Sequence, residues 1–160
     1  MPVAQVILNV NGKSVNLFST HFQWPKTSSA QRQVEAAELI AFANKFAEPR
    51  IITGDFNAQD GTPEMNTIEQ FYTDAWVTAV NANTAVAYAD NPANLATRTR
   101  RSRIDHTLYS KNATTVSVAG GQVPDTRNLA LKPVVLVGTL DDKGLRPSDH
   151  NFTIITFQVR

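Results

Sequence analysis

The sequence predicts an α/β fold built on a mixed β-sheet. Segments rich in β-branched residues, typical of strands, are interleaved along the chain with segments whose apolar residues recur at helical spacing. The length of 160 residues suits one domain with a sizeable core. A hydrophobic content of 42% with 18% charged residues is the composition of a chain that folds. We therefore expect residues 1–160 to form a single domain.

The first predicted elements form a β-hairpin. Val3–Val10 and Ser14–Ser19 are two β-rich runs. The dipeptide Asn11-Gly12 stands between them and is a strong signal for a tight turn, because both residue types accept a positive φ. The two runs are therefore expected to pair antiparallel.

A helix is predicted over the segment 26–50, with Pro49 ending it. Ser28 and Gln31 have the spacing of a capping box. Four apolar residues then fall at positions i, i+3, i+4 and i+7, which places them on one stripe of the helix. They are Leu39, Phe42, Ala43 and Phe46.

A short strand, Arg50–Thr53, leads into Gly54, and a second helix follows it. Thr62 is the expected cap and Pro63 the first helical residue, where proline is favoured. The residues expected to face inward are Met65, Ile68 and Phe71.

The rest of the chain predicts four strands and two loops. The polar stretch 81–99, which contains Pro92, and the stretch Gly120–Lys132 are the expected loops. The strand-like runs are Ile104–Ser110, Thr114–Ala119, Val134–Thr139 and Phe152–Val159.

Composition excludes several classes of function. The net charge of +1 gives no general argument for binding to nucleic acid or membranes. The absence of cysteine excludes thiol catalysis, thiolate metal sites and disulfides, and it leaves the compartment open. No apolar run is long enough to span a bilayer. The start of the chain lacks the pattern of an export signal, so we expect a cytoplasmic location, with secretion of a longer parent left open.

The stretch "TGDFNAQDGTPE" has two interpretations. Asp, Asn and Gly are turn residues, and a turn alone would explain them. Alternatively, strand alternation directs Phe56 to the core and both Asp55 and Asn57 to the other side, at the carboxyl end of a strand. Ligand sites of α/β proteins lie at such ends, and hard cations such as Mg²⁺ bind oxygen ligands of these types. The two interpretations have about even weight for this stretch alone.

Three other stretches favour the site. His21 ends the second hairpin strand, Asp105 begins a later strand, and Asp149 with His150 precedes the last one. Each has an ordinary structural explanation: an edge histidine, a cap or salt-bridge partner, a polar turn. Together they place histidines and aspartates beside apolar strands. Hydrolysis of a phosphate ester needs a metal, a positioned water and a proton donor or acceptor near neutral pH, and these residue types supply them.

The motifs resemble those of the endonuclease/exonuclease/phosphatase superfamily, which includes DNase I-like nucleases, inositol polyphosphate 5-phosphatases and sphingomyelinases. "STHF" at 19–22, "GDFNA" at 54–58, "RIDHTLYS" at 103–110 and "SDHNF" at 148–152 occur in the family's order. The chain is similar over nearly its whole length, including Asp74–Trp76. The resemblance implies a mixed sheet with helices on one face, half of the family's four-layer DNase I-like α/β sandwich.

The resemblance also implies a role for each motif residue. Asp55 would orient or deprotonate the attacking water, and Asn57 would hold the phosphate or the metal shell. Asp149 would be a metal ligand, with Asp55 and Asn57 beside it, and the metal would be Mg²⁺ or Mn²⁺. His150 would pair with Asp105 and contact the phosphate, and His21 would be a second phosphate contact and a candidate acid for the leaving oxygen.

The residues around Asp105 have different expected roles. His106 should face away from Asp105 by strand alternation, which makes it structural. Arg98, Arg100, Arg101 and Arg103 come shortly before or within the same motif. They would either bind substrate phosphate, with Arg101 and Arg103 the closest candidates, or form a solvated loop, and both interpretations stay open.

The chain departs from the family in one respect. The family's domain opens with a strand that ends in Asn and continues to a metal-binding Glu, yet no acidic residue precedes Glu35 here. The resemblance therefore implies an N-terminally truncated domain with about one of the two sheets absent. An exposed apolar sheet face would follow, and with it a homodimer or association with a complementary half.

Two functions from different classes remain. The first is a divalent-metal-dependent phosphodiesterase, nuclease or phosphatase; the second is a weakly active or silent half-domain that acts in assembly or binding. DNA, RNA, phosphoinositides, sphingomyelin and small phosphomonoesters all stay open as substrates of the first, since fold does not fix function.

Overall fold

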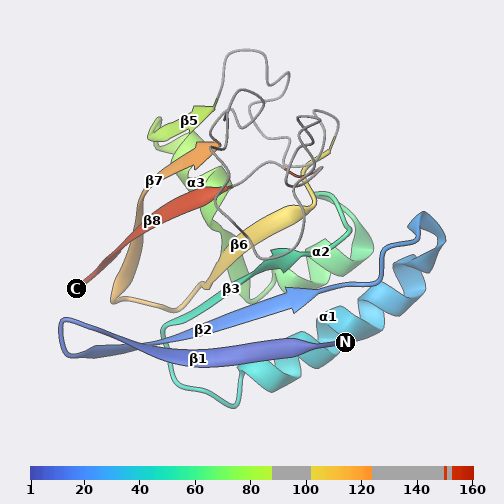
Figure 1. The fold of residues 1–160 in the computed structure, drawn as a ribbon, viewed down its shortest axis with the longest axis horizontal. Coiled ribbons are helices and arrows are strands. Elements are labelled where there is room, and N and C mark those ends of the chain that lie inside the picture. The colour runs from blue at the N-terminus through green and yellow to red at the C-terminus, as the bar shows by residue number, and fades with distance from the viewer. Residues whose placement is uncertain (88–101, 124–149, 151–152) are drawn as a thin grey trace, which may run out of the picture.

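The computed structural model describes residues 1–87, 102–123, 150 and 153–160. The described strands form two mixed sheets, one of five strands and one of three. Figure 1 shows β1, β2, β3 and β6 of the larger sheet in that order, with α1 alongside and the smaller sheet beyond β6. The predicted α/β class with a mixed sheet is confirmed.

The five-stranded sheet carries the residues of interest. Its order is β1-β2-β3-β6-β4, with β2 and β3 parallel and the other neighbours antiparallel. The bounds are Val3–Val10 for β1, Lys13–His21 for β2, Arg50–Asp55 for β3, Tyr72–Asp74 for β4 and Asp105–Ser110 for β6.

The hairpin of β1 and β2 is confirmed. The strands pair antiparallel from Val3 opposite Thr20 to Val10 opposite Lys13. Asn11 and Gly12 have φ values of 52° and 80°. Successive positive φ values match the right-handed twist of the two strands, which explains why this dipeptide sets their register.

Two helices cover one face of the larger sheet. They are α1, Ser29–Ala43, preceded by a short 3₁₀ helix η1 at Lys26–Ser28, and α2, Pro63–Ile68. Apolar residues of both helices form one buried cluster with sheet residues, among them Leu39, Met65, Phe18, Ile52 and Leu108. Burial of this cluster holds the helices on that face.

Three details of the helix predictions were wrong. Ser28 precedes α1, but its side chain makes no capping hydrogen bond, so the predicted capping box does not form. The helix ends at Ala43, well before Pro49. Phe71 lies beyond the end of α2 and is about half exposed, whereas Met65 and Ile68 are buried as expected.

The second sheet covers part of the opposite face. It consists of β5 (Ala85–Ala87), β7 (Val116–Val123) and β8 (Ile154–Val159), in the order β5-β7-β8. Val116 of β7 packs with Val15 and Ile51 of the larger sheet. The expectation that about one whole sheet is absent was therefore wrong, because at least a part of a second sheet is present.

The smaller sheet corrects the predicted loops. Gly120–Val123 belongs to β7, so the expected loop from Gly120 begins too early. The helix α3, Ala75–Asn81, and the short strands β4 and β5 were not predicted, and α3 contacts β7 and β6. The predicted strand Val134–Thr139 lies outside the described residues. Within the described part of the chain, no helix is long and apolar enough to cross a membrane.

The register of the larger sheet brings three motif residues together. His21 lies beside Asp55 in the parallel pair of β2 and β3, and Asp55 lies opposite Asp105 in the antiparallel pair of β3 and β6. Gly54 allows the close approach of β3 to β2, since a Cβ atom there would lie 2.0 Å from the carbonyl oxygen of Thr20. The strand pairing alone therefore places these side chains in one row.

Candidate active site

Asp55 and Asp105 of this row line a pocket at the end of the larger sheet together with His150, and His21 lies next to Asp55. The pocket has a volume of about 250 Å³ and is open to solvent. The neighbouring residue Phe56 is fully buried in the cluster beneath the helices. Alternation then directs Asp55 to the other face of the sheet, as expected. The lining residues are Thr53, Gly54, Asp55, Asp105, His106, Thr107, His150 and Thr153.

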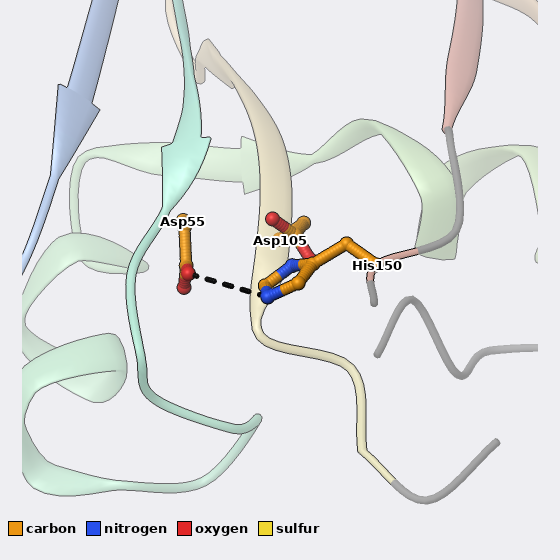
Figure 2. Close-up of side chains that lie close together, drawn as sticks. All are labelled: Asp55, Asp105 and His150. Carbon is orange, nitrogen blue, oxygen red and sulfur yellow. Dashed lines mark hydrogen bonds and ion pairs between the residues drawn. The ribbon is translucent and has the colours of Figure 1, made fainter. Parts of the chain in front are cut away.

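His150 lies between two carboxylates. Its Nδ1 is 2.8 Å from Oδ2 of Asp105, and its Nε2 is 3.8 Å from Oδ2 of Asp55. Figure 2 shows the ring between the two aspartates, which come from the end of β3 and the start of β6. A carboxylate at Nδ1 accepts the proton of that nitrogen and so directs Nε2 to the pocket. The expected pairing of Asp105 with His150 is present.

The two carboxylate oxygens of Asp55 have different neighbours, one in a turn and one in the pocket. Its Oδ1 accepts the backbone N–H of Asn57 at 2.8 Å, which is an Asx turn. Its Oδ2 is directed to the histidines, 3.6 Å from Nε2 of His21 and 3.8 Å from Nε2 of His150. The turn is therefore present at one carboxylate oxygen, and the other oxygen faces the histidines of the pocket. The metal or phosphate site of the second interpretation stays a prediction.

Asn57 joins the turn to the neighbouring strand. Its φ of 47° is in the left-handed region, which asparagine accepts more readily than most residues. Its Nδ2 donates to the carbonyl oxygen of Phe22 at 3.0 Å and lies 3.3 Å from Nε2 of His21. The amide nitrogen thus holds β2 and its following loop against β3, and the amide oxygen has no hydrogen-bond partner among the described residues.

His21 is the most accessible of these side chains. Its imidazole is 63% exposed, compared with 24% for that of His150. A side chain at the pocket's open rim can meet the part of a substrate that leaves into solvent. The structure thus brings together His21, Asp55, Asn57, Asp105 and His150.

A second polar cluster lies behind the pocket, on the other side of β6. Asp74 accepts hydrogen bonds from the N–H of Val77 at 3.0 Å and from Nη1 of Arg103 at 2.6 Å, and it lies 2.9 Å from Nδ1 of His106. His106 donates from Nε2 to the carbonyl oxygen of Ala58 at 3.0 Å. The cluster therefore ties β6 to α3 and to the loop that follows Asn57.

The carboxyl of Asp74 is strongly stabilised as an anion. Burial by itself raises its pKa, but the hydrogen bond from His106 and the positive charge of Arg103 outweigh that effect and lower the pKa to about 2. An ionised carboxylate can remain buried here because cationic and N–H donors surround it.

The role expected for Arg103 was wrong. Its guanidinium is buried and forms ion pairs with Asp74 and Asp60, so it is not available to a substrate phosphate. Arg101 and Asp149 lie outside the described residues. His106 faces away from Asp105 and is buried, as strand alternation indicated.

The side chains of the pocket fit a divalent cation. Ligand atoms of Asp55, Asp105 and His150 lie within 4.8 Å of one another, and carboxylate oxygens are preferred by Mg²⁺ and Mn²⁺. Asp60, Asp74 and His106 form a similar group, but the guanidinium of Arg103 already pairs with both of its carboxylates. The pocket group is the better candidate.

Sequence reasoning missed two hydroxyls in the pocket. Thr53 and Thr107 are paired across β3 and β6, and their Oγ1 atoms are 3.5 Å apart. They lie two residues from Asp55 and Asp105 respectively, on the same face of the sheet. The period of two along each strand was the signal that could have identified them.

The buried cluster generates a prediction about stability. Asp74→Asn keeps the shape of the side chain and removes its charge, which leaves Arg103 with less counter-charge in a buried position. We expect a loss of about 3–5 kcal/mol in the free energy of unfolding at neutral pH, measured by urea denaturation.

The same substitution has a pH signature. Because the folded-state pKa of Asp74 is lowered from 3.8 to about 2, its charge stabilises the fold above pH 3.8, and this contribution disappears as the pH falls through about 2. The difference in the free energy of unfolding between wild type and Asp74→Asn should therefore become smaller as the pH approaches 2. Glu38→Gln, on the exposed side of α1, is the control. A constant difference from neutral pH to pH 2 would contradict the assignment.

Comparison with solved structures supports the fold. The endonuclease/exonuclease/phosphatase from Bacteroides vulgatus is 21% identical with a TM-score of 0.68, over 99% of this chain and 54% of that one. D. rerio TDP2 in complex with a single strand DNA product is 17% identical with a TM-score of 0.65, over 98% and 61%. The mannosyl-6-phosphatase of Bacteroides thetaiotaomicron is 19% identical with a TM-score of 0.57, over 91% and 52%.

The chain spans between about half and three fifths of the length of these three structures. No curated protein matches it at a significant level. The model of the Endonuclease/Exonuclease/phosphatase family matches residues 2–150, which is nearly the whole sequence. The order of the motifs, the fold and this match agree, and the chain belongs to the Endonuclease/Exonuclease/phosphatase family.

Proposed function

We propose that the pocket hydrolyses phosphate esters with the help of a divalent metal, most simply as a phosphodiesterase or nuclease. The observation that carries this proposal is the position of His150, held by Asp105 at 2.8 Å and facing Asp55 across the pocket. Membership of the family supports the reaction class, and the similarity to a mannosyl-6-phosphatase is consistent with it.

The proposed reaction has water as the nucleophile. The water attacks phosphorus while Asp55 orients it and takes its proton through Oδ2, the oxygen that the Asx turn leaves open. The ester bond between phosphorus and the leaving oxygen breaks, and His21 donates a proton to that oxygen. In this step His150 acts as the imidazolium, which donates from Nε2 to a phosphate oxygen and stabilises its negative charge. Asp105 accepts the proton of Nδ1 and holds the ring so that Nε2 faces the phosphate.

Asn57 positions these groups. Its side chain binds Phe22 and lies beside His21, so it fixes the distance between the proposed acid on β2 and the proposed base on β3. Its amide oxygen is the candidate contact for phosphate or for the metal's ligand shell.

A metal would be held by Asp55, by the amide oxygen of Asn57 and by Asp149. Asp105 and His150 lie close enough to take part. When bound, Mg²⁺ or Mn²⁺ would neutralise the charge that develops on the phosphate oxygens.

Nucleic acid is a candidate substrate. The solved complex of D. rerio TDP2 holds a single strand DNA product. The net charge of +1 does not favour a long polyanion over a small ester. We therefore propose a short contact with the substrate, of one or a few phosphate units.

The second hypothesis, a weakly active half-domain, retains support from an exposed apolar face. Val6 and Leu8 of β1 are 49% and 43% exposed. They pair with Leu17 and Val15, whose face is the one that the smaller sheet covers in part. We propose that a second copy of the chain covers the remainder; a separate complementary half is the other form of the same idea.

The proposed reaction is tested with bis-p-nitrophenyl phosphate. Release of p-nitrophenol should require Mg²⁺ or Mn²⁺ and stop with EDTA. Asp55→Asn should lower the rate by roughly 10²–10⁴-fold and Asp149→Ala should weaken metal binding in titration calorimetry. Hydrolysis that continues in EDTA, or a tight metal site unaffected by Asp149→Ala, would contradict the assignment.

The pairing of Asp105 with His150 is tested by a kinetic double-mutant cycle. His150→Ala should cost roughly 10²–10⁴-fold in kcat/KM, and Asp105→Asn should cost much of the same, because the ring loses its orientation. The double variant should lose little more than the worse single variant. Glu38→Gln is the charge control. Additive losses would show that the two residues act separately.

Association is tested by light scattering after size exclusion at micromolar concentration. We expect a species larger than the 17.6 kDa monomer. Val6→Ser with Leu8→Ser should shift it to the monomer, because those two side chains supply apolar surface to the contact. A wild-type chain that is monodisperse at 17.6 kDa and binds no hydrophobic dye would refute the association.

A further inference from the structure

The loop between β2 and η1 presents an exposed tryptophan near the pocket. Trp24 is 73% exposed, the largest fraction among the exposed large hydrophobic residues of the described chain. It lies three residues after His21, so the two Cα atoms are at most about 11 Å apart even in a fully extended chain. A group attached to a phosphate at His21 can therefore reach the indole.

The stem of this loop is bonded directly to the site. The N–H of Phe22 donates to the carbonyl oxygen of Asp55 at 2.9 Å, and the carbonyl oxygen of Phe22 accepts from Nδ2 of Asn57 at 3.0 Å. Phe22 itself is buried. The residue two positions before Trp24 is thus fixed to the strand end that carries Asp55.

Two buried charged side chains hold the backbone on both sides of Trp24. Nη1 of Arg32 donates to the carbonyl oxygens of Gln23 at 3.2 Å and Pro25 at 2.8 Å. Oε2 of Glu35 accepts the N–H of Gln23 at 3.0 Å. Arg32 and Glu35 are 4% and 5% exposed. A lone exposed aromatic residue is ordinary, but the backbone on both sides of this one is already fixed, so binding of a ligand need not order the loop as well.

The hydrogen bonds that hold this loop extend to the two helices that cover the sheet. Nε of Arg32 donates to Oε1 of Glu64 at 2.6 Å, and Glu64 is fully buried and also accepts from the hydroxyl of Ser29 at 2.8 Å. The loop is therefore tied through Arg32 to both α1 and α2, the helices that support the sheet. This arrangement resembles the support of a binding residue more than that of a surface turn.

We propose that Trp24 stacks on a nucleobase of a substrate whose phosphate binds at His21, so that the substrate is a single-stranded nucleic acid. The proposal rests on the proposed function for the identity of the phosphate site. An indole presents a wide flat face that stacks on any base without regard to sequence, and the exposed Lys26, two residues on, can contact a neighbouring phosphate. Unstacked bases of a single strand have free faces, whereas those of a duplex do not.

The proposal is tested by binding in EDTA, so that hydrolysis is not needed. The probes are a fluorescein-labelled oligothymidylate and an abasic deoxyribose-phosphate chain of the same length, measured by anisotropy. Wild type should bind the oligothymidylate more tightly. Trp24→Ala should weaken that binding by about 5- to 150-fold, which corresponds to a stacking contact of about 1–3 kcal/mol, and should leave the abasic chain unaffected.

Two further variants separate stacking from structure. Trp24→Phe keeps a ring and should retain most of the preference for bases. Val34→Ala removes an exposed apolar side chain from α1 and should change neither affinity. The buried Trp76, 2% exposed, reports by its emission that each Trp24 variant remains folded.

The outcomes are distinct. Equal binding of both probes by wild type, or an equal loss for both probes in Trp24→Ala, would overturn the stacking role. An inactive enzyme that still prefers the oligothymidylate through Trp24 would instead contradict the proposed hydrolysis and leave the base contact standing.

Discussion

The buried carboxylate of Asp74 is the interaction on which the arrangement of the site depends. One side chain caps α3 through Val77, pairs with Arg103 and meets His106, and His106 reaches on to Ala58. Three segments that are distant in the sequence, at Ala58, at 74–77 and at 103–106, are therefore joined through this carboxylate and His106. A buried charge is costly unless its partners are in place. This carboxylate therefore stabilises the fold only when β6 is in its native register.

Strand β6 connects this cluster to the pocket. Asp105 and His106 are consecutive and point to opposite faces, as the alternation of a strand requires. Fixing His106 on one face therefore fixes Asp105 on the other, and through Asp105 the ring of His150. The orientation of the histidine in the pocket is in this way a consequence of an ion pair that is buried on the other side of the strand.

Local patterns in the sequence predicted much of this. The hairpin followed from Asn11-Gly12, and the opposite directions of Phe56 and Asp55 followed from a period of two, because both depend on neighbouring residues alone. The grouping of His21, Asp55, Asp105 and His150 required the family's motifs, since no local rule says that β2, β3 and β6 are adjacent.

The predictions that were wrong concern features that local patterns in the sequence do not determine. Arg103 was a candidate to bind substrate phosphate or to lie in a solvated loop, yet Asp74 and Asp60, far away in the sequence, pair with it. Phe71 fitted an apolar helical stripe, but α2 ends at Ile68 before the stripe reaches it. The strands β4 and β5 have three residues each, too few for any periodicity to indicate them.

The position of β1 has a further consequence for handling the protein. Among the described strands, β1 has a neighbour on one side only, so the backbone N–H and C=O groups of its outer edge meet no other described strand. Its Val6, Ile7 and Leu8 are all exposed, and the strand has neither proline nor a charged residue. Natural proteins protect such edges with charges, prolines or bulges, because a bare edge is a template for another strand. The isolated chain is therefore expected to aggregate at high concentration by edge-to-edge pairing of β1. A lysine at an outward position of β1 should reduce this aggregation.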